Sequence, residues 1–375
     1  MKGEHTQGLT HKGVDRLITI SLCMIVKNEE SVLERCLSSI ADAVDEIVIV
    51  DTGSTDRTKE IASEFTDKIY DFEWINDFSK ARNESYSKAT MEYQMWLDAD
   101  DILLPEEKDK LIDLKKTLSG DVDMVMMKYN TNFDEKGNPI LTSHRERLTK
   151  REKNYKWQEP VHECIPLSGN VFHSDITITH KKEDYERTSG RNLMIYEKLE
   201  KSGKRMNARQ LYYFARELKD HGQYKKAIRY FDKFLVGKQG WIEDNIGACF
   251  NLAVCYRTID EQEKRLESLF RSFQYDSPRA EICCEIGYYY KDRQDYKQAI
   301  DWFRIALALG EPVSMGFILR DYWGYIPHIE LCVCYYKLGN IEKAEYHNTQ
   351  AGLLKPYAKA VELNTNFFNS LKSEK

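Results

Sequence analysis

The spacing of apolar residues divides the chain into two parts, and this division constrains the fold more than any other feature of the sequence. From Ile18 to about Ile178, short runs rich in β-branched residues alternate with amphipathic stretches. Strands that alternate with helices predict a mostly parallel sheet with right-handed crossovers. From about Gly190 the spacing is that of helices alone. We therefore predict a flexible N-terminal segment at residues 1–17, an α/β domain at 18–189 and an all-helical domain at 190–375.

The alternating part predicts a series of strands and helices. The expected strands are Ile18–Val26, Glu46–Val50, Lys68–Asp71, Tyr93–Leu97 and Met124–Tyr129. The expected helices are Glu29–Ala41, Thr55–Phe65, Ser79–Ala89 and Glu106–Leu118. An alternating run at Val171–Thr179 adds a further strand. This order is typical of nucleotide-binding α/β architectures.

The helical part contains three stretches that resemble one another: Leu211–Leu235, Ile282–Ala308 and His328–Leu354. Each joins an aromatic-rich helix to a second helix through a turn of small or polar residues. The second helix carries an alanine where paired helices would approach closely, at Ala227, Ala299 and Ala344. The stretches resemble tetratricopeptide repeats, with a degenerate further unit at Ala248–Tyr275. Their spacing is irregular, so the number of units stays open.

Composition narrows the classes of function. The formal net charge of -6 argues against a general nucleic-acid binder, although the run His144–Lys156 is a candidate basic patch. No stretch approaches the roughly 20 apolar residues of a membrane-spanning helix, and the N-terminal segment lacks the apolar core of a signal peptide. We expect a cytoplasmic protein without an integral membrane segment. The nine cysteines show no metal-binding spacing, so we expect buried, reduced thiols.

The strongest chemical signal is Asp98-Ala99-Asp100-Asp101, directly after an expected strand. Open α/β sheets bind ligands at the carboxyl ends of their strands. Two carboxylates there, Asp98 and Asp100, would hold a hard divalent cation such as Mn²⁺ or Mg²⁺. Alone the motif is weak, because acidic residues also solvate loops and cap helices.

Other motifs precede it in a defined order: Val26-Lys27-Asn28-Glu29-Glu30, Asp51-Thr52-Gly53-Ser54 and Lys80-Ala81-Arg82-Asn83. Together they resemble the donor-binding half of family 2 glycosyltransferases, inverting enzymes with the GT-A fold, over about Thr19–Asn192. The resemblance implies a UDP-sugar donor, with UDP-glucose favoured. It implies that the donor is bound by Val26, Asn28, Glu30, Asp51, Lys80, Arg82, Asn83, Asp98 and Ala99. The alternative for Lys80 is a solvated helix face.

The same resemblance places the acceptor chemistry after the sheet. An inverting displacement needs a general base that deprotonates the acceptor during attack. Glu163 is favoured, because it lies where the family's acidic base normally sits; His162 and Glu159 are the rival candidates. The chain has His-Glu where the family more often has Glu-Asp. His180 corresponds to a histidine that often completes the metal site with Asp100 and Asp98.

A subset of the family joins these motifs to tetratricopeptide-like repeats and includes the sublancin-type peptide glycosyltransferases. The resemblance therefore favours transfer of a hexose to a peptide acceptor, at a Cys or Ser side chain of a bacteriocin-like peptide. The alternative enzyme adds a sugar to a cell-surface glycan or lipopolysaccharide core. The alternative outside enzymes is a repeat scaffold with an inactive transferase domain. We expect the helical part to bind the acceptor or a second subunit, and a homodimer to form.

Overall fold

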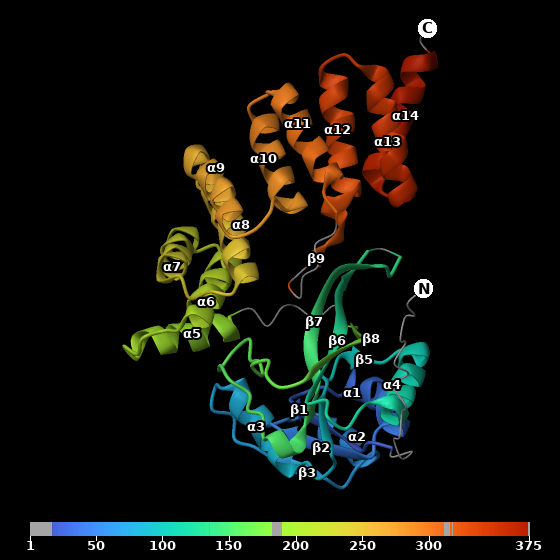
Figure 1. The fold of residues 1–375 in the computed structure, drawn as a ribbon, viewed down its shortest axis with the longest axis vertical. Coiled ribbons are helices and arrows are strands. Elements are labelled where there is room, and N and C mark those ends of the chain that lie inside the picture. The colour runs from blue at the N-terminus through green and yellow to red at the C-terminus, as the bar shows by residue number, and fades with distance from the viewer. Residues whose placement is uncertain (1–16, 135, 182–189, 311–315, 317, 374–375) are drawn as a thin grey trace, which may run out of the picture. The chain divides into compact units, whose positions relative to one another are not determined.

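The computed structural model describes residues 17–134, 136–181, 190–310, 316 and 318–373 (Figure 1). Contacts divide the chain into two compact units. Unit 1 comprises Met1–Tyr129 and His144–Asp184, and unit 2 comprises Asn130–Ser143 and Tyr185–Lys375. The predicted N-terminal segment 1–17, apart from Leu17, and the predicted boundary at 189 lie outside the described residues.

Unit 1 is built on a mixed sheet with the order β3-β2-β1-β4-β7-β6-β8-β5. The predicted α/β class is confirmed, because β1 to β4 pair in parallel in the order β3-β2-β1-β4. β7 then runs antiparallel to β4, and β5 antiparallel to β8. The strands are β1 Ile20–Val26, β2 Glu46–Asp51, β3 Ile69–Asp71, β4 Tyr93–Trp96, β5 Asp101–Ile102, β6 Met124–Phe133, β7 Pro139–Lys150 and β8 Val171–His180.

The two faces of this sheet follow the period-two alternation of its strands. In β1, Ile20, Leu22 and Met24 belong to one large apolar core together with residues of α1 (Leu33–Ile40) and α4 (Pro105–Thr117). On the other face, Trp96 packs edge-to-face on Trp157. α3 (Phe78–Lys88) lies on that second face, through Tyr86 against the same Trp157. Both faces are therefore covered, which explains why β1, β2 and β4 are buried along almost their whole length.

Two predicted helices are shorter than expected, and side chains of the neighbouring segment bind the amides ahead of one of them. The helix expected from Glu29 begins at Leu33, and that expected from Thr55 becomes α2, Thr58–Ser63. The amide of Glu29 donates to Thr58 Oγ1 (2.7 Å) and that of Glu30 to Asp56 Oδ2 (3.2 Å). Thr58, the first residue of α2, and Asp56 thus supply acceptors for two amides ahead of α1.

Half of the candidate basic patch at His144–Lys156 is the interior strand β7, and only the residues after it, such as Arg151, Lys153 and Lys156, are exposed cations. Arg147 is fully buried and pairs with the equally buried Asp101 (2.9 Å). Arg145 lies over the Trp96 ring at 4.7 Å. The positive charges of the strand are thus neutralised inside the protein and do not form a surface for phosphates.

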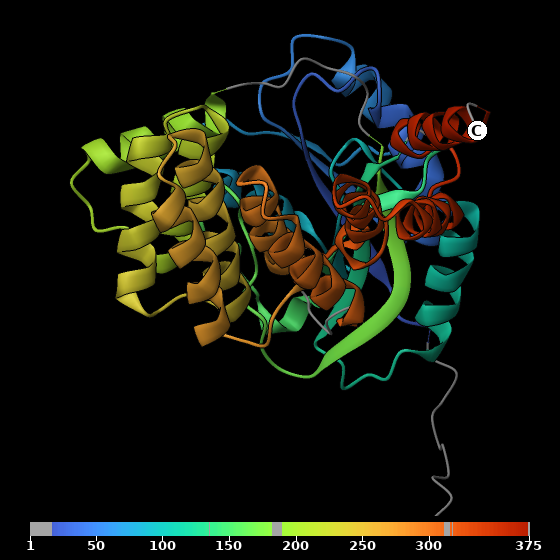
Figure 2. The same ribbon diagram turned by 90° about the horizontal axis from the view of Figure 1, so that it is seen from above.

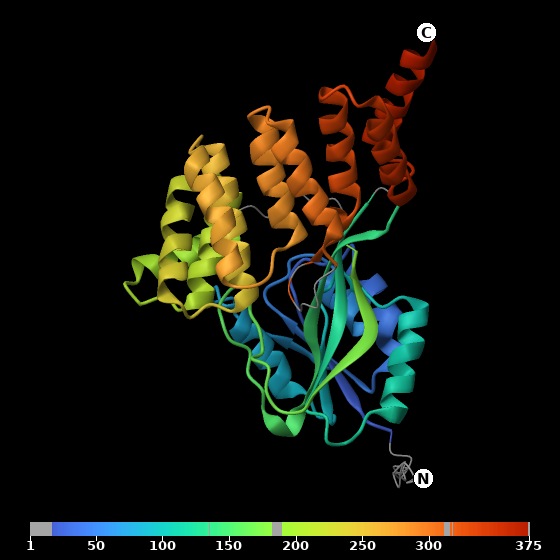
Figure 3. The same ribbon diagram turned by 45° about the horizontal axis from the view of Figure 1, so that its top comes forward.

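Apart from the ends of β6 and β7 and the short strand β9 (Ile318–Leu319), which pairs with β7, the described part of unit 2 is helical. Its helices pack as consecutive pairs, α6 on α7, α8 on α9, α10 on α11 and α12 on α13. Figures 1, 2 and 3 show these pairs following one another in chain order. The predicted repeat class is confirmed, and Ala227, Ala299 and Ala344 are completely buried between helices as expected. The helices are α5 Arg191–Lys201, α6 Ala208–Asp220, α7 Tyr224–Gly237, α8 Ile242–Thr258, α9 Gln262–Arg271, α10 Ala280–Asp292, α11 Tyr296–Ala308, α12 Tyr325–Lys337, α13 Ile341–Leu354 and α14 Lys359–Ser373.

Two further features were expected from composition. All nine cysteines are free, and eight of them are buried, Cys164 being half-buried. Within the described ranges, no helix combines the length and the apolar character needed to cross a membrane.

Candidate active site

The carboxyl ends of β1, β2 and β4 meet at one edge of the sheet and carry most of the predicted site. Val26 lies opposite Asp51 in the β1–β2 register, and its carbonyl accepts from the Thr52 amide (2.9 Å). The Asp98 segment follows β4 directly. The parallel register therefore places residues of three separate motifs side by side, as open α/β sheets do at their ligand sites.

Asp51 is the most deeply buried of the predicted donor-binding residues, with 1% of its surface exposed. Its Oδ1 accepts from the amides of Gly53 and Ser54, both at 2.9 Å. Gly53 has a φ of 103°, which a residue with a side chain rarely adopts. Oδ2 is buried and has no hydrogen-bond partner among the described residues. A buried carboxylate oxygen without a partner is costly unless a ligand donates to it.

Asn28 and Glu30 join two loops at the same edge. Asn28 Oδ1 accepts from the Thr55 amide (2.8 Å), and the Asn28 amide donates to Ser54 Oγ (2.9 Å). Glu30 Oε2 accepts from the Arg57 amide (2.9 Å). The side chains predicted to face a nucleobase thus hold together the two loops that border Asp51.

Arg82 connects two parts of the predicted site. It is 5% exposed and donates from Nη2 to Asp98 Oδ1 and from Nε to Glu163 Oε1, each at 2.6 Å. Its guanidinium lies 4.7 Å from the Trp96 ring and 4.9 Å from the Trp157 ring. Burial raises the pKa of Asp98, but the charges of Arg82 and Arg147 outweigh burial and lower it to about 2. Asp98 is therefore an anion held by arginine.

The remaining residues predicted to bind the donor differ in their surroundings. Asn83 donates from Nδ2 to the Trp157 carbonyl and accepts at Oδ1 from the Trp157 amide, both at 2.9 Å. The Lys80 amide helps to begin α3 by donating to the N-cap Asp77 (3.2 Å), and the residue is exposed. Ala99 is buried in the core. Asn83 is thus committed to the backbone of the segment that leads to Glu159, His162 and Glu163.

A carboxylate–histidine cluster lies beside Asp98. Ligand atoms of Asp100, Asp101 and His180 lie within 4.8 Å of one another. β5 and β8 bring them together, because Asp101 pairs with His180 in the register. Burial lowers the pKa of His180, but Asp100 and Asp101 outweigh it and raise the pKa to about 10. Without a metal ion, His180 is therefore a cation paired with two carboxylates, and it would release its proton to a bound divalent cation, which oxygen and imidazole donors suit.

Asp101 was not predicted as a site residue, yet it organises this cluster. Its Oδ1 accepts from Tyr129 Oη (2.8 Å) and lies 3.3 Å from His180 Nδ1. Its Oδ2 accepts from Arg147 (2.9 Å) and from the Asp98 amide (3.1 Å). The sequence did contain one indication of this arrangement. Arg145, Arg147 and Thr149 alternate with the spacing of a strand whose polar face points into the protein. Long-range pairing of this kind was not visible in the local pattern around Asp98.

The three candidate bases lie on one short loop. Gln158 and Cys164 form an isolated antiparallel bridge, with N to O distances of 2.9 and 3.1 Å. Between them, Glu159 (φ 75°) and His162 (φ 54°) adopt the left-handed backbone region. The Pro160 carbonyl accepts from the Phe78 amide at the start of α3 (2.9 Å). Non-glycine residues in this region store strain, which is concentrated at functional sites in proteins.

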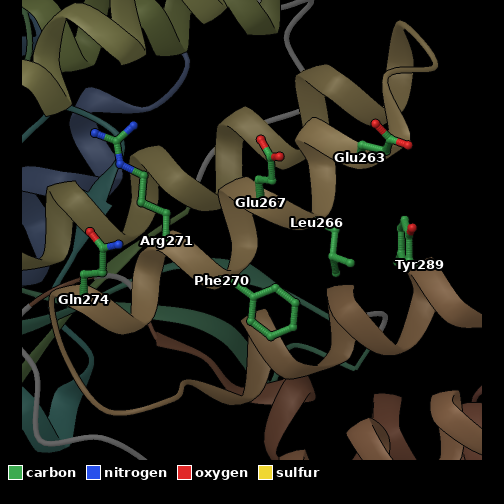
Figure 4. A pocket seen from close by; sticks show the side chains of 7 residues that line it. All are labelled: Glu263, Leu266, Glu267, Phe270, Arg271, Gln274 and Tyr289. Atoms are coloured by element: carbon green, nitrogen blue, oxygen red, sulfur yellow. The ribbon is translucent and has the colours of Figure 1, made fainter.

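Unit 2 has a hollow of its own, of about 610 Å³ (Figure 4). Leu266 and Phe270 of α9 form its apolar wall, with Tyr289 of α10 beside them. Glu263 and Glu267 of α9 line it as well. The remaining lining residues are Arg271 and Gln274. This hollow combines an apolar wall with acidic side chains.

Comparison with known proteins gives a family for the first half of the chain. Residues 21–173 match Glycosyl transferase family 2. A TPR repeat-containing protein of Synechococcus elongatus is 36% identical over 149 residues, which are 39% of this chain and 35% of that protein. The SPbeta prophage-derived glycosyltransferase SunS of Bacillus subtilis is 29% identical over 228 residues, 57% of this chain and 53% of SunS.

Among solved structures, MamA from Desulfovibrio magneticus is similar to 46% of this chain over 89% of its own length, with 17% identity and a TM-score of 0.37. The chain spans about a third to a half of the length of the two sequence relatives. The predicted resemblance is confirmed for the segment that carries the site, because residues 21–173 match the family 2 glycosyltransferase domain.

Proposed function

We propose that the chain is an inverting glycosyltransferase that moves a hexose from a UDP-sugar, with UDP-glucose favoured, to a peptide side chain. The observation that carries the proposal is the sheet edge at which the partnerless Asp51 Oδ2 and the Asp100–His180 cluster meet within a family 2 domain. Asp51 would accept from the donor's uracil or ribose. The loops joined by Asn28 and Glu30 would border that pocket.

Asp100 and His180, with Asp98 or Asp101 beside them, would hold Mn²⁺ or Mg²⁺. A bound divalent ion supplies neutralisation of the negative charge on a leaving nucleoside diphosphate. Arg82 pairs with Asp98 and Arg147 pairs with Asp101, so both carboxylates are fixed in orientation. The side chains of the site are therefore arranged before the donor binds, which avoids reorganisation during the reaction.

Glu163 remains our favoured base. A base removes the acceptor proton as the acceptor attacks the anomeric carbon, so it must hold that proton at a defined atom. Arg82 fixes Glu163 Oε1 and also holds Asp98, so one cation links the base to the donor side. His162 and Glu159 stay rival candidates, because they lie on the same loop.

We propose that unit 2 binds the acceptor or a second copy of the chain, and that residues 18–189 and 190–375 act as separate domains. The hollow on α9 supports a peptide acceptor, because its apolar and acidic lining matches a segment with apolar and basic side chains. A cell-surface glycan remains the alternative acceptor. An inactive transferase domain on a repeat scaffold remains the alternative outside enzymes.

The decisive experiment measures donor binding and donor use together. With Mn²⁺ present, UDP should raise the melting temperature, because a ligand that binds only the folded state stabilises it. Asp51→Asn should abolish the rise, whereas Asp67→Asn, at an exposed position, should keep it. Incubation with a panel of nucleotide sugars and peptides, followed by intact mass, identifies the sugar and the acceptor. If no nucleotide stabilises the protein and no nucleotide sugar is consumed, the proposed activity is wrong.

A further inference from the structure

The loop that carries Glu159, His162 and Glu163 is held on both sides by residues outside it. Before the loop, Asn83 makes its reciprocal pair with the Trp157 backbone, with both distances 2.9 Å. At its far end, Arg145 Nη2 donates to the Glu163 carbonyl (3.2 Å) and Glu146 Oε1 accepts from the Ile165 amide (3.2 Å). The two sides of the loop are thus fixed through its backbone groups, in addition to the side-chain bond of Glu163 to Arg82.

Arg145 and Glu146 form an ion pair in which Glu146 is buried and Arg145 is half-buried. Their side chains pair at 3.3 Å, and Glu146 is 5% exposed. The Arg145 guanidinium lies over Trp96, whose Nε1 donates to the Glu146 carbonyl (2.5 Å). Burial raises the pKa of Glu146, but Arg145 outweighs burial and the net shift is downward, so both partners stay charged. The pair therefore presents a fixed donor and a fixed acceptor to the loop.

Stability alone does not account for this arrangement. Replacing a buried ion pair by apolar residues of similar size is often neutral or stabilising. What an apolar pair does not supply is directed hydrogen bonding to two backbone groups, at Glu163 and Ile165. The loop needs such bonds, because its two left-handed residues are each strained by roughly 1–3 kcal/mol and persist only where surroundings over-determine them.

We infer that Arg145 and Glu146 are positioning residues that keep the strained loop, and with it the general base, in its working conformation. The inference rests on the proposed function, since the loop matters for catalysis only if it carries the base. It assigns a role to two residues of β7 that no motif of the donor site includes.

Glu146→Ala and Glu146→Gln test the inference, with Glu152→Gln as the matched control on the exposed end of the same segment. Misplacement of a catalytic group by about 1 Å costs on the order of 10²-fold in rate. We expect Glu146→Ala to lower kcat for transfer about 10²-fold while the donor KM and the UDP-induced shift in melting temperature stay within about twofold. Glu146→Gln keeps an acceptor for the Ile165 amide and should recover much of the rate.

Amide hydrogen exchange provides the second readout and does not depend on activity. The Ile165 and Cys164 amides should lose protection in Glu146→Ala and keep it in Glu152→Gln. Should the alanine variant fail to fold, Glu146→Gln decides: a partial loss of kcat at unchanged donor KM supports the inference, and a wild-type kcat overturns it. Unchanged kcat and unchanged protection in a folded Glu146→Ala protein would overturn the inference. A wild-type protein that consumes no nucleotide sugar would instead refute the proposed function, while exchange at Ile165 still decides whether the pair holds the loop.

Discussion

Replacing Arg82 by methionine should destabilise unit 1 more than any exposed charge change does. Arg82 is buried between Trp96 and Trp157 and holds two carboxylates, Asp98 and Glu163, each at 2.6 Å. Methionine fills a similar volume between the rings but supplies no charge. The variant would leave both carboxylates near each other without their common cation.

The magnitude follows from the buried position. Removing one partner of a buried ion pair costs about 3–5 kcal/mol, because an uncompensated charge remains inside. For a unit of this size that corresponds to a fall in melting temperature of roughly 10 °C. The stability of Arg82→Lys should lie between those of the wild type and Arg82→Met. Lysine keeps the positive charge, but its ammonium group lacks the planar guanidinium that binds two carboxylates and stacks on aromatic rings.

Urea unfolding at pH 7.5 measures the effect, followed by tryptophan fluorescence because Trp96 and Trp157 flank the arginine. Arg57→Met is the control, since Arg57 pairs with Glu60 at the surface. The double variant Arg82→Met/Glu163→Gln should regain part of the lost stability, because it removes one uncompensated charge. If Arg82→Met unfolds at the same urea concentration as Arg57→Met, the argument that Arg82 neutralises both carboxylates is wrong.

Three further outcomes are expected. Asp100→Asn should remove Mn²⁺-dependent donor hydrolysis in a folded protein, and chelation should do the same to the wild type; full turnover in chelator would contradict the metal assignment. Glu163→Gln should lower kcat by roughly 10²- to 10⁴-fold with donor KM nearly unchanged, whereas an unaffected rate would transfer the role to His162. Burial and His328 lower the pKa of His347 to about 4. Between about pH 6.5 and pH 4 the unfolded chain therefore binds more protons than the folded protein, and the free energy of unfolding decreases as the pH is lowered. When the pH is lowered from 7.5 to 5.5, the free energy of unfolding of His347→Gln should therefore decrease by about 1 kcal/mol less than that of the wild type. Equal decreases for the two proteins in urea unfolding would refute the burial of a neutral imidazole.

The parallel strands could be predicted because buried strands consist mainly of consecutive apolar residues, and such runs are visible in the sequence. Glu46–Val50, for example, was expected as a strand, and β2 is buried along its whole length. The strand β7 was missed, because its charged run has the composition of a surface. Arg147 is tolerated in the interior only through Asp101, 46 residues earlier in the chain. A local pattern contains no information about such a partner.

The location of the candidate site could be predicted from the sequence, but what each of its side chains binds could not. Strand ends identified Asp51, Asp98 and Asp100, because parallel strands bring their carboxyl ends to one edge. Asn83 was expected at the donor, yet both of its polar groups bind the Trp157 backbone. An amide matches a nucleobase and a peptide backbone equally well, so residue type alone could not decide between them.

The division of roles among the three aspartates follows from where the arginines lie. Arg82 forms an ion pair with Asp98, and Arg147 forms one with Asp101, so the charge of each of these carboxylates is balanced by a buried arginine. Within the described part of the chain, the Asp100 carboxylate pairs with His180 and with no arginine. Asp100 is also more exposed than Asp101, with 26% of its side chain accessible against none. Of the three carboxylates, Asp100 is therefore the one that no arginine holds in the described residues, and its partner is His180. This makes Asp100 the main ligand of the divalent ion that we propose, with His180 releasing its proton as the ion binds.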